Sequence, residues 1–128
     1  MCKTWLIEDR PMTTKGGCFC GTIRYEFDAE SIPVADCHCT MCRRTSGAPY
    51  VTWLVVPVDQ FRYVSGEVRT LRSSEQGTRY FCGECGTPIA CVNHSHPEII
   101  DLTLGSLDEP ENFKPSFSVF EDTRLPHL

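Results

Sequence analysis

Seven of the nine cysteines in the chain fall into two groups whose spacing suits metal binding. Cys18 and Cys20 have an i, i+2 spacing, which places both side chains on the same face of an extended segment. Cys82 and Cys85 are separated by two residues in the glycine-containing run 82–86, whose sequence suits a tight turn. Together the two pairs give a four-cysteine set that suits a closed tetrahedral zinc site.

The second group is the run 37–42, in which Cys37, Cys39 and Cys42 combine both spacings. Three sulfurs from a single loop can bind one ion, and the fourth ligand has no obvious local candidate. Structural zinc usually has four protein ligands, whereas functional zinc commonly has three and leaves one position for water or substrate. The sequence therefore predicts two Zn²⁺ ions per chain, one in a closed site and one in an open site.

Four other residues are alternative candidates for ligands or neighbours of the second zinc. His94 and His96 are the main candidates for its fourth position, and binding by either would close the site. Cys91 follows an apolar run and is more typical of a small buried hydrophobic residue than of a ligand. His38 lies between two ligands, so we expect its side chain to point away from the ion. Cys2 is interpreted as a thiol of the N-terminal tail.

The charge of the open site indicates its chemistry. Zinc with three thiolates carries a net charge of −1, so it is a weak Lewis acid and favours a soft fourth ligand such as a thiol. A coordinated thiol is deprotonated and becomes a nucleophile that can add to a carbonyl group. Arg43 and Arg44 directly follow Cys42, where we expect them to bind the carboxylates of an anionic thiol substrate.

Composition restricts the class of protein. The chain has 128 residues, of which 41% are hydrophobic, and this fits one domain. Its formal net charge of −5 disfavours nucleic-acid binding. No run is long and apolar enough for a membrane span, and charged residues interrupt the N-terminal apolar run, which disfavours a secretory signal. We therefore expect a cytoplasmic protein with metal-bound thiols rather than disulfides, whose oligomeric state the sequence does not reveal.

Short apolar runs separated by turn-forming residues predict a mainly β domain over residues 16–128, after a tail or edge segment at 1–15. Residues 22–27 alternate between apolar and polar positions, as in a half-buried strand. The apolar run 50–56 predicts a central strand. A single helical turn is expected within residues 108–113. The other expected strands are 61–64, 69–73, 78–82, 88–92, 98–104 and 116–120.

Four motifs resemble those of the glutathione-dependent formaldehyde-activating enzymes, a family that includes a centromere-associated branch. The resemblance covers roughly residues 16–125, and the cysteine spacings are the features most specific to this family. The motifs are GCFCG at 17–21, CHCTMCRRTSG at 37–47, RYFCGECGT at 79–87 and LGSLD at 104–108.

This resemblance implies a single-domain β-tent of short antiparallel strands stapled by zinc. It matches Cys18, Cys20, Cys82 and Cys85 to the structural zinc. It matches Cys37, Cys39 and Cys42 to a second zinc whose open position accepts the glutathione sulfur. The implied activity is that of a carbon–sulfur lyase of the S-hydroxymethylglutathione synthase type, acting on a glutathione adduct of formaldehyde or another small aldehyde.

The C-terminal part departs from the family pattern at two positions. Ser118 stands where the family often has His, and His127 stands where Trp usually follows Pro. These departures affect the choice of substrate rather than the fold. The alternative function is a non-catalytic zinc-stapled binding module or a glutathione carrier, in which the same cysteines bind zinc without turnover.

Overall fold

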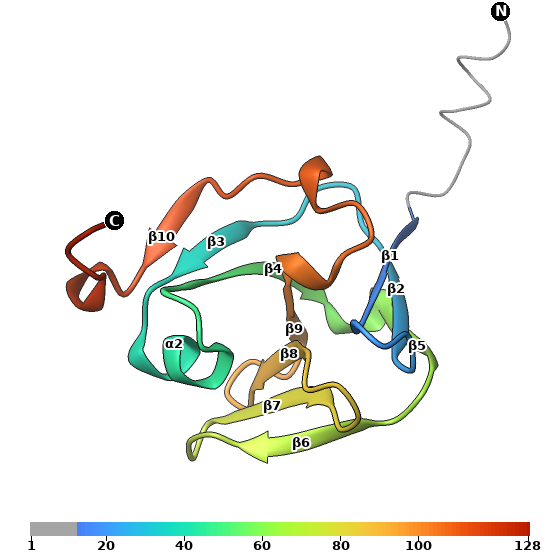
Figure 1. The fold of residues 1–128 in the computed structure, drawn as a ribbon. Helices are drawn as coiled ribbons and strands as arrows, with labels where there is room; N and C mark the ends of the chain where they lie inside the picture. Colours follow the sequence, from blue (N-terminus) through green and yellow to red (C-terminus); the bar gives the residue numbers. More distant parts are fainter. Residues whose placement is uncertain (1–12) are drawn as a thin grey trace, which may run out of the picture.

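The computed structural model describes residues 13–128, which form two β-sheets, one short α-helix and several 3-10 turns (Figure 1). The mainly β prediction is confirmed. Cys2 and most of the segment 1–15 lie outside the described residues, and the first strand begins at Thr13. The strands are β1 (Thr13–Gly17), β2 (Arg24–Asp28), β3 (Val34–Cys37), β4 (Val51–Pro57), β5 (Phe61–Ser65), β6 (Val68–Arg72), β7 (Gly77–Cys82), β8 (Pro88–Asn93), β9 (Ile99–Thr103) and β10 (Phe117–Val119).

The small sheet has the order β1-β2-β5, and the large sheet has the order β10-β3-β4-β9-β8-β7-β6. Of the strand pairs within residues 13–128, only β10 with β3 is parallel, so the expected antiparallel pattern holds except at this edge. The strand predicted at 50–56 is β4, which lies inside the large sheet between β3 and β9, as its apolar run predicts.

The core contains apolar side chains from both sheets. Ile23, Tyr25 and Phe27 come from the alternating run around β2, and each is fully or almost fully buried. They belong to one cluster with Leu54 of β4 and Leu102 of β9. The two-residue period of β2 places its apolar positions on the face toward the large sheet and its charged positions toward solvent.

Helical structure is limited to short segments. They are α2 (Thr40–Ser46) and the 3-10 turns η1 (Val58–Gln60), η2 (Leu104–Ser106), η3 (Pro110–Asn112) and η4 (Glu121–Thr123). The turn predicted within 108–113 is confirmed as η3. In residues 13–128, every helix falls far short of the length needed to cross a membrane.

Candidate functional site

The first cysteine cluster, formed by Cys18, Cys20, Cys82 and Cys85, joins loops from both sheets. Cys18 and Cys20 follow β1, whereas Cys82 ends β7 and Cys85 lies in the tight turn before β8. The four sulfurs all lie within 4.8 Å of one another. The Cys20 sulfur is 3.6 Å from that of Cys18 and 3.7 Å from that of Cys82. The structure therefore brings together the predicted four-cysteine set.

Local donors stabilise negative charge on these sulfurs. The backbone N–H of Ile23 donates to Cys18 Sγ at 3.2 Å, and that of Glu84 donates to Cys82 Sγ at 3.4 Å. The hydroxyl of Thr87 lies 3.2 Å from Cys85 Sγ, and it is the main reason that the pKa of Cys85 is lowered to about 5. A thiol with a lowered pKa is ready to bind a metal ion as a thiolate.

The second cysteine cluster contains Cys37, Cys39 and Cys42, whose sulfurs also lie within 4.8 Å of one another. The Cys42 and Cys37 sulfurs are 3.4 Å apart, and both residues are buried. The backbone N–H of Cys42 donates to Cys39 Sγ at 3.2 Å. In the structure described for residues 13–128, this group offers three side-chain ligands to one ion.

The expectation that these three cysteines share a single loop is wrong. Cys37 ends β3, Cys39 is the N-cap of α2, and Cys42 lies within the helix. The helix forms because the Cys39 side chain accepts a hydrogen bond at its N-terminus and Gly47 ends it in the left-handed conformation, with φ of 73°. One helical turn replaces the loop and brings the Cys39 and Cys42 sulfurs together.

The second cluster opens into a cavity of about 360 Å³, which we call the thiol cavity. Apolar residues at its mouth include Met41 and the exposed aromatic residues Phe117 and Phe120. The polar side chains that line it are Ser73, Ser74, Gln76, Asn93, Arg79 and Asp101. The three sulfurs are therefore accessible from a cavity large enough for a small-molecule ligand, at the lower end of the usual size range.

Arg79 of β7 is the cation at this site. Its Nη2 donates to Cys42 Sγ at 3.7 Å, and its Nε donates to Ser73 Oγ at 3.0 Å. The guanidinium carbon lies 6.0 Å from the ring centroid of Trp53. Arg79 lies 37 residues from Cys42 in the chain, so no local spacing in the sequence connects the two residues.

The electrostatics of the thiol cavity favour a thiolate at Cys42. The pKa of Cys42 is lowered, first by the hydrogen bond from Cys37 and also by those from Arg79 and Trp53. Asp101 of β9 lines the same cavity, and its pKa is raised to about 6, mainly by burial and also by the negative charge of Cys42. The thiol cavity thus brings together the Cys42 thiol with a lowered pKa, the Arg79 guanidinium, and the Asp101 carboxyl group with a pKa raised to about 6.

Arg43 and Arg44, which we expected to bind substrate, lie on α2 outside the residues that line the thiol cavity. Their predicted role is untested by this geometry. Cys91 lines the cavity and packs against the second cluster, but its sulfur is not part of the three-cysteine group.

Among the described residues, the candidate histidines do not join the three cysteines of the second cluster in a ligand group. His94 Nε2 is 2.8 Å from the hydroxyl of Thr78, and His96 pairs with Glu98 at 3.7 Å. His38 is buried, its ring centroid is 5.1 Å from that of Tyr50, and it is not part of the cysteine group. None of the three histidines belongs to a ligand group in the described residues.

The two C-terminal departures occupy exposed positions. Ser118 lies on β10 opposite Asp36 of β3, and His127 lies near the C-terminus. The neighbouring residues Phe117 and Phe120 line the thiol cavity. The C-terminal segment is attached to the cysteine-bearing run through Thr123, whose hydroxyl donates to the backbone oxygen of His38 at 2.7 Å.

Comparisons with known proteins agree with these features. A family model described as "Glutathione-dependent formaldehyde-activating enzyme" matches residues 13–123. A Halomonas elongata protein named "Putative glutathione-dependent formaldehyde-activating enzyme" is 25% identical over 105 residues, which cover 76% of this chain and 67% of that protein. A crystal structure of a Rhodobacter sphaeroides protein has a TM-score of 0.68 at 20% identity, covering 82% of this chain and 99% of that one, which indicates a shared fold.

Proposed function

Because the chain belongs to the glutathione-dependent formaldehyde-activating enzyme family, we propose that it forms or cleaves S-hydroxymethylglutathione as a zinc-dependent carbon–sulfur lyase. The observation that carries this proposal is the second cysteine cluster, whose three sulfurs line an accessible cavity beside Arg79. A cluster with three protein ligands leaves room for the sulfur of a substrate.

The distances between sulfurs support zinc as the metal at both clusters. Four thiolates at the usual Zn–S distance of about 2.3 Å in a tetrahedron have their sulfurs about 3.8 Å apart. The sulfur–sulfur separations of 3.6 and 3.7 Å in the first cluster and 3.4 Å in the second are close to this value. Thiolate ligands also favour zinc over hard cations such as Mg²⁺.

In this proposal, the first cluster is structural and the second is functional. Cys37, Cys39 and Cys42 would hold a zinc ion, which when bound would supply the chemistry of binding a thiol as a thiolate. Arg79 and Trp53 stabilise the charge on Cys42, and the polar side chains of the thiol cavity surround the peptide part of glutathione. Arg79 is also suited to pair with a glutathione carboxylate, and the same role for Arg43 and Arg44 stays a prediction.

The proposed reaction forms one C–S bond at the glutathione sulfur. The glutathione sulfur attacks the carbonyl carbon of formaldehyde, a C–S bond forms, and the π electron pair of the carbonyl moves to its oxygen. The proton lost by the thiol ends on that oxygen and completes the hydroxymethyl group. The reverse sequence cleaves the C–S bond, so one site serves both directions.

The test is whether zinc-loaded protein accelerates the exchange between glutathione plus formaldehyde and their adduct. Exchange spectroscopy by NMR measures this rate at equilibrium, and a sample without protein gives the spontaneous rate. We expect the wild-type protein to increase the exchange rate and Cys39→Ser to abolish the increase. Because Ser is a good N-cap residue, this variant keeps α2 and removes a metal ligand.

Metal content provides the matched control. Cys39→Ser should retain one zinc ion per chain, whereas Cys91→Ser, which changes a cysteine outside the three-sulfur group, should retain two. Zinc X-ray absorption should also show a light-atom ligand that glutathione replaces with sulfur. Exchange no faster than the spontaneous rate would remove the enzymatic proposal.

Binding without turnover would instead support the glutathione carrier. In that case the absorption spectrum changes on addition of glutathione, but the exchange rate does not. The expected cytoplasmic location is part of the same proposal, because free thiolate ligands persist in a reducing compartment.

A further inference from the structure

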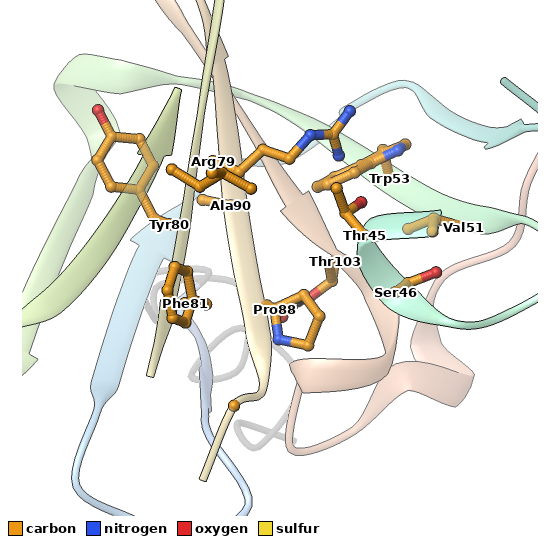
Figure 2. Close-up of a pocket in the computed structure, with 12 residues that line it drawn as sticks. Thr45, Ser46, Val51, Trp53, Arg79, Tyr80, Phe81, Pro88, Ala90 and Thr103 are labelled. Carbon is orange, nitrogen blue, oxygen red and sulfur yellow. Dashed lines mark hydrogen bonds between the residues drawn. The ribbon is translucent and has the colours of Figure 1, made fainter. Parts of the chain in front are cut away.

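A second cavity, of about 280 Å³, is lined by the side chains drawn in Figure 2. It is bounded by β7 and β8 on one side and by α2 and the start of β4 on the other. Most of its lining is apolar, and we call it the apolar slot. Its defining side chains are Val51, Trp53, Leu71, Tyr80, Phe81 and Pro88.

The two cavities meet at one pair of side chains. Trp53 and Arg79 line both of them, and Figure 2 shows Arg79 extending toward the Trp53 ring. Arg79 also donates from Nη2 to Cys42 Sγ at 3.7 Å, and its guanidinium carbon lies 6.0 Å from the Trp53 ring centroid. The helix that carries Cys42 is also shared, since Ser46 lines the slot and donates its hydroxyl hydrogen to the Cys42 backbone oxygen at 2.7 Å. Cys42 itself lines the thiol cavity, and the slot begins at Arg79, whose Nη2 lies 3.7 Å from Cys42 Sγ.

The chemistry of the two linings differs. The thiol cavity presents hydroxyl, amide, carboxyl and guanidinium groups, which suit the peptide part of a thiol such as glutathione. The apolar slot presents aromatic and aliphatic side chains, with hydroxyl groups from Thr45, Ser46 and Thr103. A polar tripeptide matches the first lining, and a carbon chain attached to its sulfur matches the second.

The size of the slot points to a group larger than the single carbon of formaldehyde. Apolar cavities of about 150 Å³ bind benzene, and this slot is about 280 Å³. One hydroxymethyl group would leave most of it to water in contact with apolar side chains, and such water is readily displaced by a hydrocarbon.

We propose that the apolar slot binds the carbon chain of the aldehyde-derived group on the glutathione sulfur, so that the substrates include adducts of aliphatic aldehydes of about four to six carbons or of aromatic aldehydes of similar size. This inference rests on the proposed function, because it uses the same sulfur position at the second cluster. The bond changes are those given above, with the aldehyde carbonyl in place of formaldehyde.

The experiment compares the binding of two stable thioethers to the zinc-loaded protein by isothermal titration calorimetry. S-methylglutathione and S-hexylglutathione share the peptide part, cannot turn over, and differ only in their apolar chain. Each methylene that leaves water contributes up to about fourfold in affinity. Since the slot is partly open, we expect S-hexylglutathione to bind at least about tenfold more tightly than S-methylglutathione.

A matched pair of variants tests where the hexyl group of the ligand binds. Leu71→Ser replaces an apolar residue of the slot that is 46% exposed, and Val64→Ser makes a similar change at a 59% exposed position on β5, in the other sheet. Leu71→Ser should weaken the binding of S-hexylglutathione by about threefold and leave that of S-methylglutathione unchanged. Val64→Ser should change neither affinity.

The outcomes separate this inference from the proposed function. Equal affinities of the two thioethers, with glutathione itself bound, would overturn the slot proposal and leave the proposed function intact. A preference for S-hexylglutathione that is reduced by Val64→Ser but not by Leu71→Ser would also overturn it, because the hexyl group would then bind outside the slot. Failure of glutathione to bind the zinc-loaded protein would overturn both.

Discussion

At the scale of single residues, Arg79 connects the two halves of the candidate site. It donates to Cys42, is held by Ser73, and packs over Trp53 at the boundary between the two cavities. The guanidinium is about half-buried, so its interaction with a thiolate is less screened than that of a surface pair. Hydrogen bonds of this charged type are among the stronger ones in proteins.

Arg79→Met is expected to weaken glutathione binding by about tenfold or more, because it removes a charged hydrogen-bond donor and keeps an apolar side chain over Trp53. Isothermal titration calorimetry measures the affinity. Zinc should also leave the second cluster more readily at mildly acidic pH, which a chromogenic chelator detects. Arg44→Met is the matched control, and a larger loss for Arg44→Met than for Arg79→Met would support the sequence prediction instead.

Asp101 gives a prediction for the pH dependence of stability. Burial raises its pKa to about 6 from an ordinary value of 3.8. Between these values the folded chain binds more protons than the unfolded chain, so the contribution of this group to the free energy of unfolding falls as pH rises through this window. The loss nears completion about one pH unit above the folded-state pKa, at about pH 7.

Asp101→Asn is therefore expected to stabilise the protein by about 1–3 kcal/mol at pH 7.5 and by less at pH 5. Urea unfolding at both pH values measures the difference. Asp59→Asn, on the exposed turn η1, should have little effect at either pH. An equal gain from Asp101→Asn at both pH values would show that charge burial is not the cause.

At the scale of elements, helix α2 converts a cysteine motif into a metal-binding geometry. The helix has only seven residues, so its stability depends on its ends. At the N-terminus of the helix, the Cys39 sulfur accepts a hydrogen bond from the backbone N–H of Cys42. At the C-terminus, the backbone N–H of Gly47 donates to the backbone oxygen of Arg43 at 2.8 Å. Because these two caps fix the ends of the helix, they also fix the position of the Cys42 sulfur within it.

Gly47→Ala is expected to reduce the free energy of unfolding by about 1–2 kcal/mol, because φ of 73° is unfavourable for a residue with a Cβ atom. The added Cβ meets no atom within 4 Å, so the effect comes from the backbone alone. Gly105→Ala provides the control, since its Cβ also meets nothing and its φ lies outside the left-handed range. Chemical unfolding of both variants should show a loss only for Gly47→Ala.

At the scale of the whole molecule, the first cysteine cluster joins the small sheet to the large one. Cys18 and Cys20 follow an edge strand of the small sheet, and Cys82 and Cys85 lie at the turn between β7 and β8. The buried pair of Tyr25 and Ser106, with hydroxyl oxygens 2.6 Å apart, connects β2 to the turn that follows β9. An ion at the cluster would close a loop of about sixty residues.

Cys20→Ser is expected to lower the free energy of unfolding by several kcal/mol, since apparent zinc binding in such sites is worth about 10–16 kcal/mol. Cys20 is exposed, so the serine hydroxyl is solvated and the loss reports on the metal rather than on packing. Urea unfolding with and without a strong chelator measures it. If the chelator destabilises Cys20→Ser as much as the wild-type protein, the assignment of Cys20 as a ligand is wrong.

The sequence by itself determined most of the strands and the spacing within each run of cysteines, because these depend on local periodicity. It did not predict strands β1 and β3, and the grouping of all four cysteines of the first cluster came from the family resemblance. Alternation along 22–27 predicts which side chains of β2 are buried, and the i, i+2 and i, i+3 spacings predict which sulfurs lie close together. The helix at 40–46 was missed, since Cys39 is not a typical N-cap residue and the run is short.

Only the tertiary structure decided which residues surround the cysteines. Antiparallel pairing sets Arg79 opposite Cys91, and Cys91 opposite Asp101, so a cation, a thiol and a carboxyl group share one face of the large sheet. The apolar slot likewise arises where β7, β8 and α2 meet. Strand order and register join positions far apart in the chain, and local spacing carries no information about either.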